Sequence, residues 1–312
     1  MRAPITSPIR RVRPASIPQA PLRPGDNLRG AMLMCVSVTG FTCNDVVMKF
    51  VTQDMPLYQA ITLRGLAMIL GIWLVALRDG GLKLHIAPGA RFAMVLRVAG
   101  EVGTTLLFLN ALMHMAIGDL TAIMQSLPLV VTGAAALVFG ERLGWRRVSA
   151  VVIGMLGVLI ILRPGSGAFG IWSLVAIGAM LMMALRDLAT RNFGAHISSS
   201  TIAFHTAVVV MLTGLFLSLR QGWVMPDLAQ LLLLALAGGF LTVGYVTAVS
   251  AMRVGEISYV APFRYVSLLV AILAGLVVFG EWPDIWTWAG SALVVGAGVY
   301  MVLREARLMR YS

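Results

Sequence analysis

The sequence predicts an all-α integral membrane protein with ten transmembrane helices, arranged as two inverted five-helix repeats. Three observations carry this prediction: the composition, a series of apolar segments, and a similarity between the two halves. The 312 residues are 59% hydrophobic and only 12% charged, with a mean hydropathy of +0.89, whereas about a quarter of the residues of soluble domains are charged. Lipid-facing helices are the simplest account of such an apolar excess.

Ten apolar segments follow one another along the chain, each close to the roughly 20 residues that cross the hydrocarbon core of a bilayer. Short connections separate them, so consecutive helices must alternate in direction. The expected limits are residues 29–50, 57–77, 91–112, 119–139, 146–163, 169–190, 199–219, 228–251, 257–279 and 285–303.

The formal net charge of +11 is unevenly distributed. Basic residues collect ahead of the first segment and in alternate connections, which indicates topology signals and not a nucleic-acid surface. We therefore expect a bacterial inner-membrane protein with both termini in the cytoplasm. The first 27 residues hold six of the 13 prolines and no apolar run. They are expected to be disordered, to bind anionic lipid headgroups and not to be a cleaved signal peptide.

The two halves of the chain resemble each other at a separation of about 137 to 142 residues. Each half holds five segments, an odd number, so the second copy must cross the membrane upside down. Inverted repeats of this kind place the substrate near the midplane and exchange conformations to expose it to either side. The matched features are Phe139-Gly140-Glu141 with Phe279-Gly280-Glu281, Asp45 with Asp187, and Lys49 with Arg191.

The repeats define the expected organisation: a basic cytoplasmic tail, the first repeat, a hinge, the inverted second repeat and a C-terminal cytoplasmic tail. The hinge region contains a G-x-G-x-x-G pattern at Gly165–Gly170, but it follows a membrane span and not a strand, so no dinucleotide site is expected. The corresponding ranges are 1–28, 29–163, 164–168, 169–304 and 305–312.

No cofactor and no metal are expected. The two cysteines, Cys35 and Cys43, lie too far apart along one helix to form a disulfide, and no histidine stands near them at ligand spacing. The chain contains no G-x-x-x-x-G-K-[ST] motif, so transport must follow a gradient or be coupled to one.

Ionisable residues inside apolar spans cost roughly 2.5 to 3.5 kcal/mol each at the midplane, so each requires a reason. Glu101 lies near the middle of its span, where it is a candidate for proton coupling or for pairing with a substrate amine. An internal ion pair with Arg97, one turn earlier, is the alternative. Arg264 lies about two turns into its span, where either a substrate carboxylate or a backbone carbonyl would satisfy it.

Further candidates fall into two groups. Polar and aromatic residues that could orient a substrate are Asn110, His114, Tyr245, Tyr259 and Tyr265. Interhelical hydrogen bonds are the alternative use of such groups. Gating or structural ion pairs are expected between residues four apart on single helices, namely Asp45 with Lys49 and Asp187 with Arg191, together with Arg97.

The chain resembles the EamA family of the drug/metabolite transporter superfamily. The residues that carry the resemblance are Leu127-Pro128 leading to Val138–Glu141, and Ala261–Tyr265 leading to Val278–Glu281. Within the superfamily it is most similar to bacterial exporters of the YddG type, which are associated with aromatic and other neutral amino acids. The resemblance implies a secondary exporter of small amphiphilic metabolites, most of all amino acids, with no enzymatic activity.

Two alternatives remain. The first keeps transport but changes the cargo to drugs or nucleotide-linked metabolites. The second is a membrane-embedded enzyme, for which the sequence offers no recognisable nucleophile, base or metal cluster. Small-x-x-x-small faces at Ala150 with Gly154 and Ala292 with Gly296 either pack the halves together or support a dimer, so both monomer and homodimer stay open.

Overall fold

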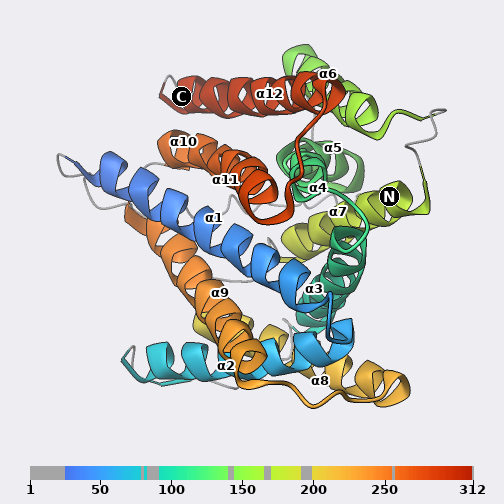
Figure 1. Cartoon of the computed structure of the whole chain (residues 1–312). Coiled ribbons are helices and arrows are strands. Elements are labelled where there is room, and N and C mark those ends of the chain that lie inside the picture. Colours follow the sequence, from blue (N-terminus) through green and yellow to red (C-terminus); the bar gives the residue numbers. More distant parts are fainter. Residues whose placement is uncertain are drawn as a thin grey trace, which may run out of the picture.

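The computed structural model describes residues 25–78, 81–82, 91–139, 144–164, 170–190, 199–254 and 257–310, and these form helices and turns with no strand. Figure 1 shows the start of α1 and the end of α12 on one side of the molecule, on the left of the view. We call this the terminal side and the opposite one the distal side. The elements are α1 Asp26–Val51, α2 Leu57–Arg78, α3 Arg91–Leu112, α4 Ile117–Met124, α5 Leu127–Phe139, α6 Trp145–Leu162, α7 Ile171–Thr190, α8 Ser199–Gln221, α9 Leu228–Val254, α10 Ile257–Val260, the 3₁₀ segment η2 Ala261–Tyr265, α11 Val266–Ala274, the π-helical segment η3 Gly275–Phe279 and α12 Ile285–Arg310.

The all-α fold is confirmed. Within the described ranges, nine helical segments are long and apolar enough to cross a membrane, and α6 contributes a shorter apolar helix, Val148–Leu162. The predicted limits agree with the helices to within a few residues, except that α12 continues to Arg310, past the expected start of the C-terminal tail at residue 305. Most of the predicted basic tail, most of the hinge and Arg191 lie outside the described residues.

Helices of one half pack mainly against helices of the other. The dominant contacts are α1 with α9, α3 with α7, α2 with α8, and α6 with α12. If the first span corresponds to the sixth and the third to the eighth, then α1 with α9 and α3 with α7 are the same contact made twice. The pairs α2 with α8 and α6 with α12 then join each helix to its own counterpart. This pattern is consistent with inverted repeats.

Glycines allow the backbones of the two halves to approach closely. A Cβ at Gly100 of α3 would lie 2.8 Å from the backbone nitrogen of Arg186 in α7. A Cβ at Gly157 of α6 would lie 2.7 Å from the carbonyl oxygen of Gly290 in α12. Of the small-residue faces predicted on these two helices, Gly154 takes part in the contact, since its Cβ would lie 3.4 Å from Cβ of Ala297, whereas nothing lies within 4 Å of a Cβ built on Gly296.

Two predicted spans are interrupted in their first halves. The fourth span divides at Gln125 and Ser126, between α4 and α5, and the ninth changes to 3₁₀ geometry at Ala261–Tyr265, which contains Pro262. Proline removes a backbone donor and disrupts helix geometry, so it favours such breaks. The side-chain amide of Gln125 donates to the carbonyl oxygen of Arg264 at 2.9 Å and to Oγ of Ser267 at 2.8 Å. The two breaks are therefore directly connected.

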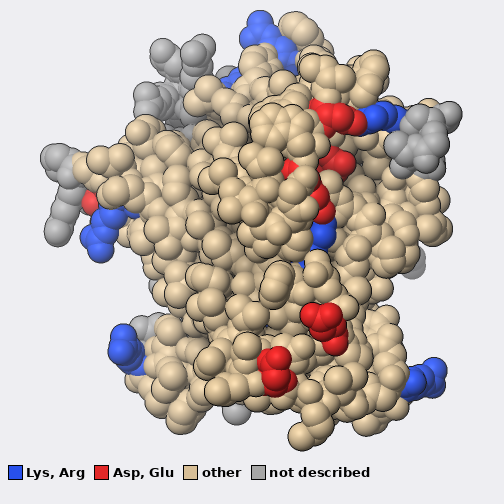
Figure 2. Space-filling view, viewed as in Figure 1, with Lys and Arg blue, Asp and Glu red and all other residues tan. Residues whose placement is uncertain are grey.

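The outer surface is largely apolar, as a lipid-facing bundle requires. Large hydrophobic side chains are exposed on helices throughout the chain, including Leu70, Phe92 and Val277. On the face drawn in Figure 2, most of the surface is uncharged; acidic side chains lie in the upper right and in the lower centre, and most of the basic ones stand toward the edges.

Candidate functional site

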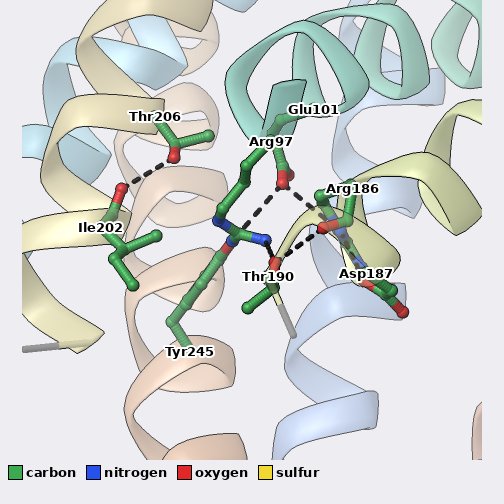
Figure 3. Close-up of polar contacts among 8 residues, drawn as sticks. All are labelled: Arg97, Glu101, Arg186, Asp187, Thr190, Ile202, Thr206 and Tyr245. Atoms are coloured by element: carbon green, nitrogen blue, oxygen red, sulfur yellow. Dashed lines mark hydrogen bonds and ion pairs between the residues drawn. The ribbon is translucent and has the colours of Figure 1, made fainter. Parts of the chain in front are cut away.

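Charged side chains from both halves meet inside the bundle. Figure 3 shows Arg97 and Glu101 of α3 facing Arg186, Asp187 and Thr190 of α7, with Tyr245 of α9 beside them. We call these six residues the central ion cluster. Glu101 is near the middle of α3, and the α7 members lie in its last two turns, so the cluster extends from mid-span toward the terminal side.

Glu101 is the shared acceptor of this cluster. Its Oε2 lies 3.3 Å from Nη1 of Arg186 and 3.8 Å from Nη2 of Arg97. Arg186 also binds Oδ1 of Asp187, through Nε at 2.9 Å and Nη2 at 2.8 Å. The close approach of α3 to α7 at Gly100 brings Arg186 within reach of Glu101. The predicted pair of Arg97 with Glu101 is thus present, but a second arginine shares the carboxylate.

Arg97 is held by polar groups from the second half. Its Nη1 donates to the Thr190 hydroxyl at 2.8 Å, and its Nη2 donates to the Tyr245 hydroxyl at 3.5 Å. Thr190 in turn donates to the carbonyl oxygen of Arg186 at 2.6 Å. The Arg97 side chain is only 8% exposed, and its Nε is buried without a hydrogen-bond partner among the described residues. Buried charges of this kind persist only when paired.

A second polar group joins α1 to α2. Nη1 of Arg64 donates to Oδ1 of Asn44 at 3.3 Å, and Nδ2 of Asn44 donates to Oδ1 of Asp45 at 2.9 Å. Asn44 and Asp45 correspond by the repeat to Arg186 and Asp187, which are also linked to each other. Both copies therefore place a carboxylate beside a hydrogen-bond donor in the preceding residue.

Arg264 lies on η2, in the interrupted part of the ninth span. Its side chain is exposed, yet it interacts electrostatically with Arg186 and Asp187 of α7. Its neighbour Tyr265 is buried and directed at α12, since a Cβ on Gly298 would overlap the Tyr265 hydroxyl.

On the distal side, Lys49 pairs with Glu281 and not with Asp45, so the predicted pairing along α1 is corrected. Nζ of Lys49 lies 2.5 Å from Oε1 of Glu281 and donates to the carbonyl oxygen of Met115 at 2.8 Å. Oε2 of Glu281 accepts from the backbone N–H of Ile117 at 2.9 Å. The left-handed conformation of Gly280, with φ of 67°, turns the chain after η3 into this position. We call Lys49, Met115, Ile117 and Glu281 the distal lock.

Two further contacts join the halves near the lock. The Thr287 hydroxyl donates to Oδ1 of Asp119 at 2.7 Å, which connects α12 to α4. Arg163, at the end of α6, forms an ion pair with Asp284, which precedes α12. Together with the lock, these contacts connect the two halves across the distal side.

Other predicted residues lie away from the cluster. Asn110 and His114 line a cavity of about 460 Å³ on the distal side, together with Thr52, Tyr58 and Gln221. The amide of Asn110 donates to the carbonyl oxygen of Leu106 at 2.7 Å. The His114 ring stacks on Trp172, with centroids 3.6 Å apart. Tyr259 contacts Phe263 in the ninth span, with ring centroids 5.9 Å apart.

Sequence reasoning named Arg97, Glu101, Asp187 and Tyr245 as candidate residues. Among these four it expected contact only between Arg97 and Glu101, and it assigned Asp187 and Tyr245 to separate roles. It missed Arg186 altogether, although an arginine directly before a recognised aspartate in an apolar span was a visible signal. It also missed that Glu281, seen only as part of a repeated motif, is the partner of Lys49.

Comparisons with known proteins agree with this architecture. The model of the EamA-like transporter family matches residues 28–163 and 170–304. A solved crystal structure that is 18% identical covers 88% of this chain and 98% of its own, with a TM-score of 0.64, which shows the same fold.

Curated relatives carry different cargoes. A riboflavin transporter of Vibrio cholerae is 30% identical over 190 residues, which are 61% of this chain and 63% of the relative. An S-adenosylmethionine uptake transporter of Rickettsia prowazekii is 26% identical over 192 residues, 61% of this chain and 64% of the relative. A pseudopaline exporter of Pseudomonas aeruginosa is 24% identical over 269 residues, 86% of this chain and 94% of the relative. The chain thus spans just under two thirds of the first two relatives.

Proposed function

The chain belongs to the EamA-like transporter family, and from this premise we propose that it is a secondary transporter of small amphiphilic metabolites, amino acids foremost, by alternating access. The observation that carries the proposal is the central ion cluster, where α3 of one half meets α7 and α9 of the other. Transporters built from inverted repeats bind cargo at this interface, near interrupted helices. The cluster lies at such an interface, and the interruptions lie in the fourth and ninth spans, one in each half.

The chemistry of the cluster supports a cargo with charged ends. Arginine and carboxylate side chains are costly inside a bilayer and are retained where they bind substrates, ions or one another. Glu101 and Asp187 offer acceptors for an amine, and Arg97 and Arg264 offer donors for a carboxylate. Amino acids, including aromatic ones, present both groups on a small and partly apolar body.

Alternating access is supported by the unequal packing of the two sides. In this structure the distal lock joins the two halves. The pair α2 with α9 and the pair α8 with α3 are related by the repeat, but the first pair is packed more extensively than the second. We infer a conformation closed on the distal side. The opposite state then requires Lys49 and Glu281 to separate.

We further propose an inner-membrane location with cytoplasmic termini, and export as the physiological direction. The excess of basic residues in the tail and in alternate connections supports the orientation. The relatives include uptake and export proteins, so direction rests on the resemblance to exporters stated above.

A second candidate cargo is riboflavin, because the 30% identical relative from Vibrio cholerae is a riboflavin transporter. This candidate requires space for a large aromatic ring system. A direct comparison of cargoes separates the two proposals.

The test is counterflow in proteoliposomes. Vesicles preloaded with unlabelled threonine, methionine or phenylalanine should accumulate the corresponding labelled amino acid faster than protein-free vesicles do. Riboflavin and S-adenosylmethionine are measured in parallel. If only riboflavin is transported, riboflavin becomes the assigned cargo. If no amino acid is transported, the proposal that amino acids are the cargo fails.

A further inference from the structure

A groove on the outer surface runs between α6 and α12, the two helices at the top of Figure 1. It has a volume of about 330 Å³, and no charged residue lines it. Its floor is formed by Ala150 and Ala297, which are buried in one hydrophobic cluster. Its rims include Ile153 and Tyr300, which are 44% and 48% exposed. The groove therefore opens outward, between one helix of each half.

The groove is elongated and open at its centre. The residues of α12 that line it run from Ala292 to Tyr300, which is about 12 Å along the helix axis. Gly296 stands halfway along this stretch, and nothing lies within 4 Å of a Cβ built on it. An elongated apolar depression of this kind suits a hydrocarbon chain, because its walls offer a charged solute no partner.

Basic residues stand one helical turn beyond the end of the groove that faces the terminal side. Arg304 follows Tyr300 by four residues on α12, and Arg146 precedes Ser149 by three residues on α6. Residues at these spacings share a helix face, so both arginines stand on the face that carries the groove. Ser149 and Tyr300 line this same end and add two hydroxyl groups.

The charges of these two arginines are not balanced by the fold. Among the described residues, no carboxylate pairs with either of them. The Arg146 side chain is exposed, and its guanidinium carbon lies 5.3 Å from the centre of the Trp145 ring. Nη1 of Arg304 is buried without a hydrogen-bond partner in the described part of the chain. Beyond Arg304, α12 continues to Arg310 and carries two more arginines and one glutamate. Basic pockets between membrane helices attract anionic headgroups.

We propose that this groove binds an anionic phospholipid of the phosphatidylglycerol type, with an acyl chain against Ala150, Gly296 and Ala297 and the phosphate near Arg146 and Arg304. A second copy of the chain is the competing occupant. A two-fold axis along the membrane normal would bring the same arginines of both copies together, and like charges repel, so the charge pattern favours the lipid. The inference is independent of the cargo.

The experiment measures lipid binding to the full chain and not transport. Native mass spectrometry in detergent micelles counts bound dioleoyl phosphatidylglycerol and dioleoyl phosphatidylcholine, each titrated separately. The two lipids share their acyl chains and differ in headgroup charge. Each arginine near an anionic headgroup contributes about fivefold in affinity, so the first site of the natural chain should bind phosphatidylglycerol about 25-fold more tightly. Equal binding of the two lipids would overturn the proposal.

Variants separate the acyl chain from the headgroup. Gly296→Leu places a side chain in the open centre of the groove and should weaken binding of both lipids about tenfold or more. Gly239→Leu on α9, where nothing lies within 4 Å of a Cβ either, is its matched control and should bind as the natural chain does. Arg146→Gln with Arg304→Gln should abolish the preference for phosphatidylglycerol and leave phosphatidylcholine binding unchanged. Arg220→Gln, at the exposed end of α8, should change neither.

Melting curves in detergent establish that each variant is folded. If Gly296→Leu does not fold, the double arginine variant decides alone, and a retained preference for phosphatidylglycerol contradicts the proposal. The same spectra give the number of protomers. A natural dimer that Gly296→Leu converts to a monomer, with lipid binding unchanged, would assign the groove to a second copy instead. None of these measurements depends on flux, so failure of the lipid site and failure of the proposed transport function are separate results.

Discussion

Lys49 and Glu281 stand 232 residues apart in the sequence and meet at 2.5 Å, which joins the end of α1 to the connection between η3 and α12. Glu281 additionally accepts the N–H of Ile117, and Lys49 binds the Met115 carbonyl oxygen. One ion pair thus fastens three segments of the distal side, two from the first half and one from the second.

We predict that Glu281→Gln weakens the closed distal side. The loss should be about 1 to 2 kcal/mol of unfolding free energy, below the ~3–5 kcal/mol of a fully buried pair, because the Glu281 side chain is 26% exposed. Leu120→Cys, in a background with Cys35 and Cys43 replaced by serine, should react faster with an impermeant maleimide when Glu281→Gln is added, since Leu120 is fully buried here.

The double variant Lys49→Glu with Glu281→Lys should restore slow labelling only in part, because it recreates the ion pair but not the hydrogen bonds to the Met115 carbonyl oxygen and the Ile117 N–H. Asp54→Asn removes a carboxylate from the same side at an exposed position and serves as the control. Equal labelling rates in all four proteins would exclude the lock as a determinant of closure.

Glu101→Gln should destabilise the protein more strongly than Glu281→Gln. Arg97 and Arg186 both rely on this carboxylate, and removing one partner of buried charges costs about 3–5 kcal/mol. Chemical unfolding in detergent measures the effect. Flux with and without a pH gradient gives a second readout: persistence of gradient dependence in the variant would show that Glu101 is not the coupling group.

Gly100→Ala should separate α3 from α7. The new Cβ would lie 2.8 Å from the backbone nitrogen of Arg186 and 2.9 Å from the carbonyl oxygen of Met182, and neither backbone atom has a rotamer that relieves the clash. We expect a loss of about 1–3 kcal/mol in stability and a marked fall in transport. Gly239→Ala on α9, where nothing lies within 4 Å of the new Cβ, should be silent in both assays.

Tyr265→Phe should leave transport within about twofold of the natural chain. The Tyr265 hydroxyl is buried without a hydrogen-bond partner among the described residues and points to α12, so its removal costs little and can stabilise the fold. A large loss of amino-acid flux with normal melting would instead restore Tyr265 to the substrate site predicted from the sequence.

Hydropathy located the helical segments well because lipid leaves a spanning chain few alternatives to the helix. The pair of Arg97 with Glu101 was also predictable, since residues four apart on a helix are neighbours. The partners of Lys49 and Asp187 were not. Lys49 had Asp45 at the favourable spacing, but contacts between distant segments decide which carboxylate a flexible lysine reaches, and spacing along one helix carries no information about them.

The helix breaks illustrate the same limit. Pro128 and Pro262 stand close to the interruptions, yet proline is tolerated inside membrane helices when neighbours satisfy the released backbone groups. Whether the helix continues past such a residue depends on those neighbours. Here the neighbour is Gln125, which binds the carbonyl oxygen of Arg264 in the ninth span. No local sequence pattern predicts this contact between distant segments.

The Gln125 amide has a consequence for specificity. Because it binds both the carbonyl oxygen of Arg264 and the hydroxyl of Ser267, the fourth and ninth spans cannot bend independently at their interruptions. A shift in one half is passed mechanically to the segment that presents Arg264. Redesigning this protein for another cargo would therefore have to preserve Gln125, an uncharged side chain that joins the two interrupted spans.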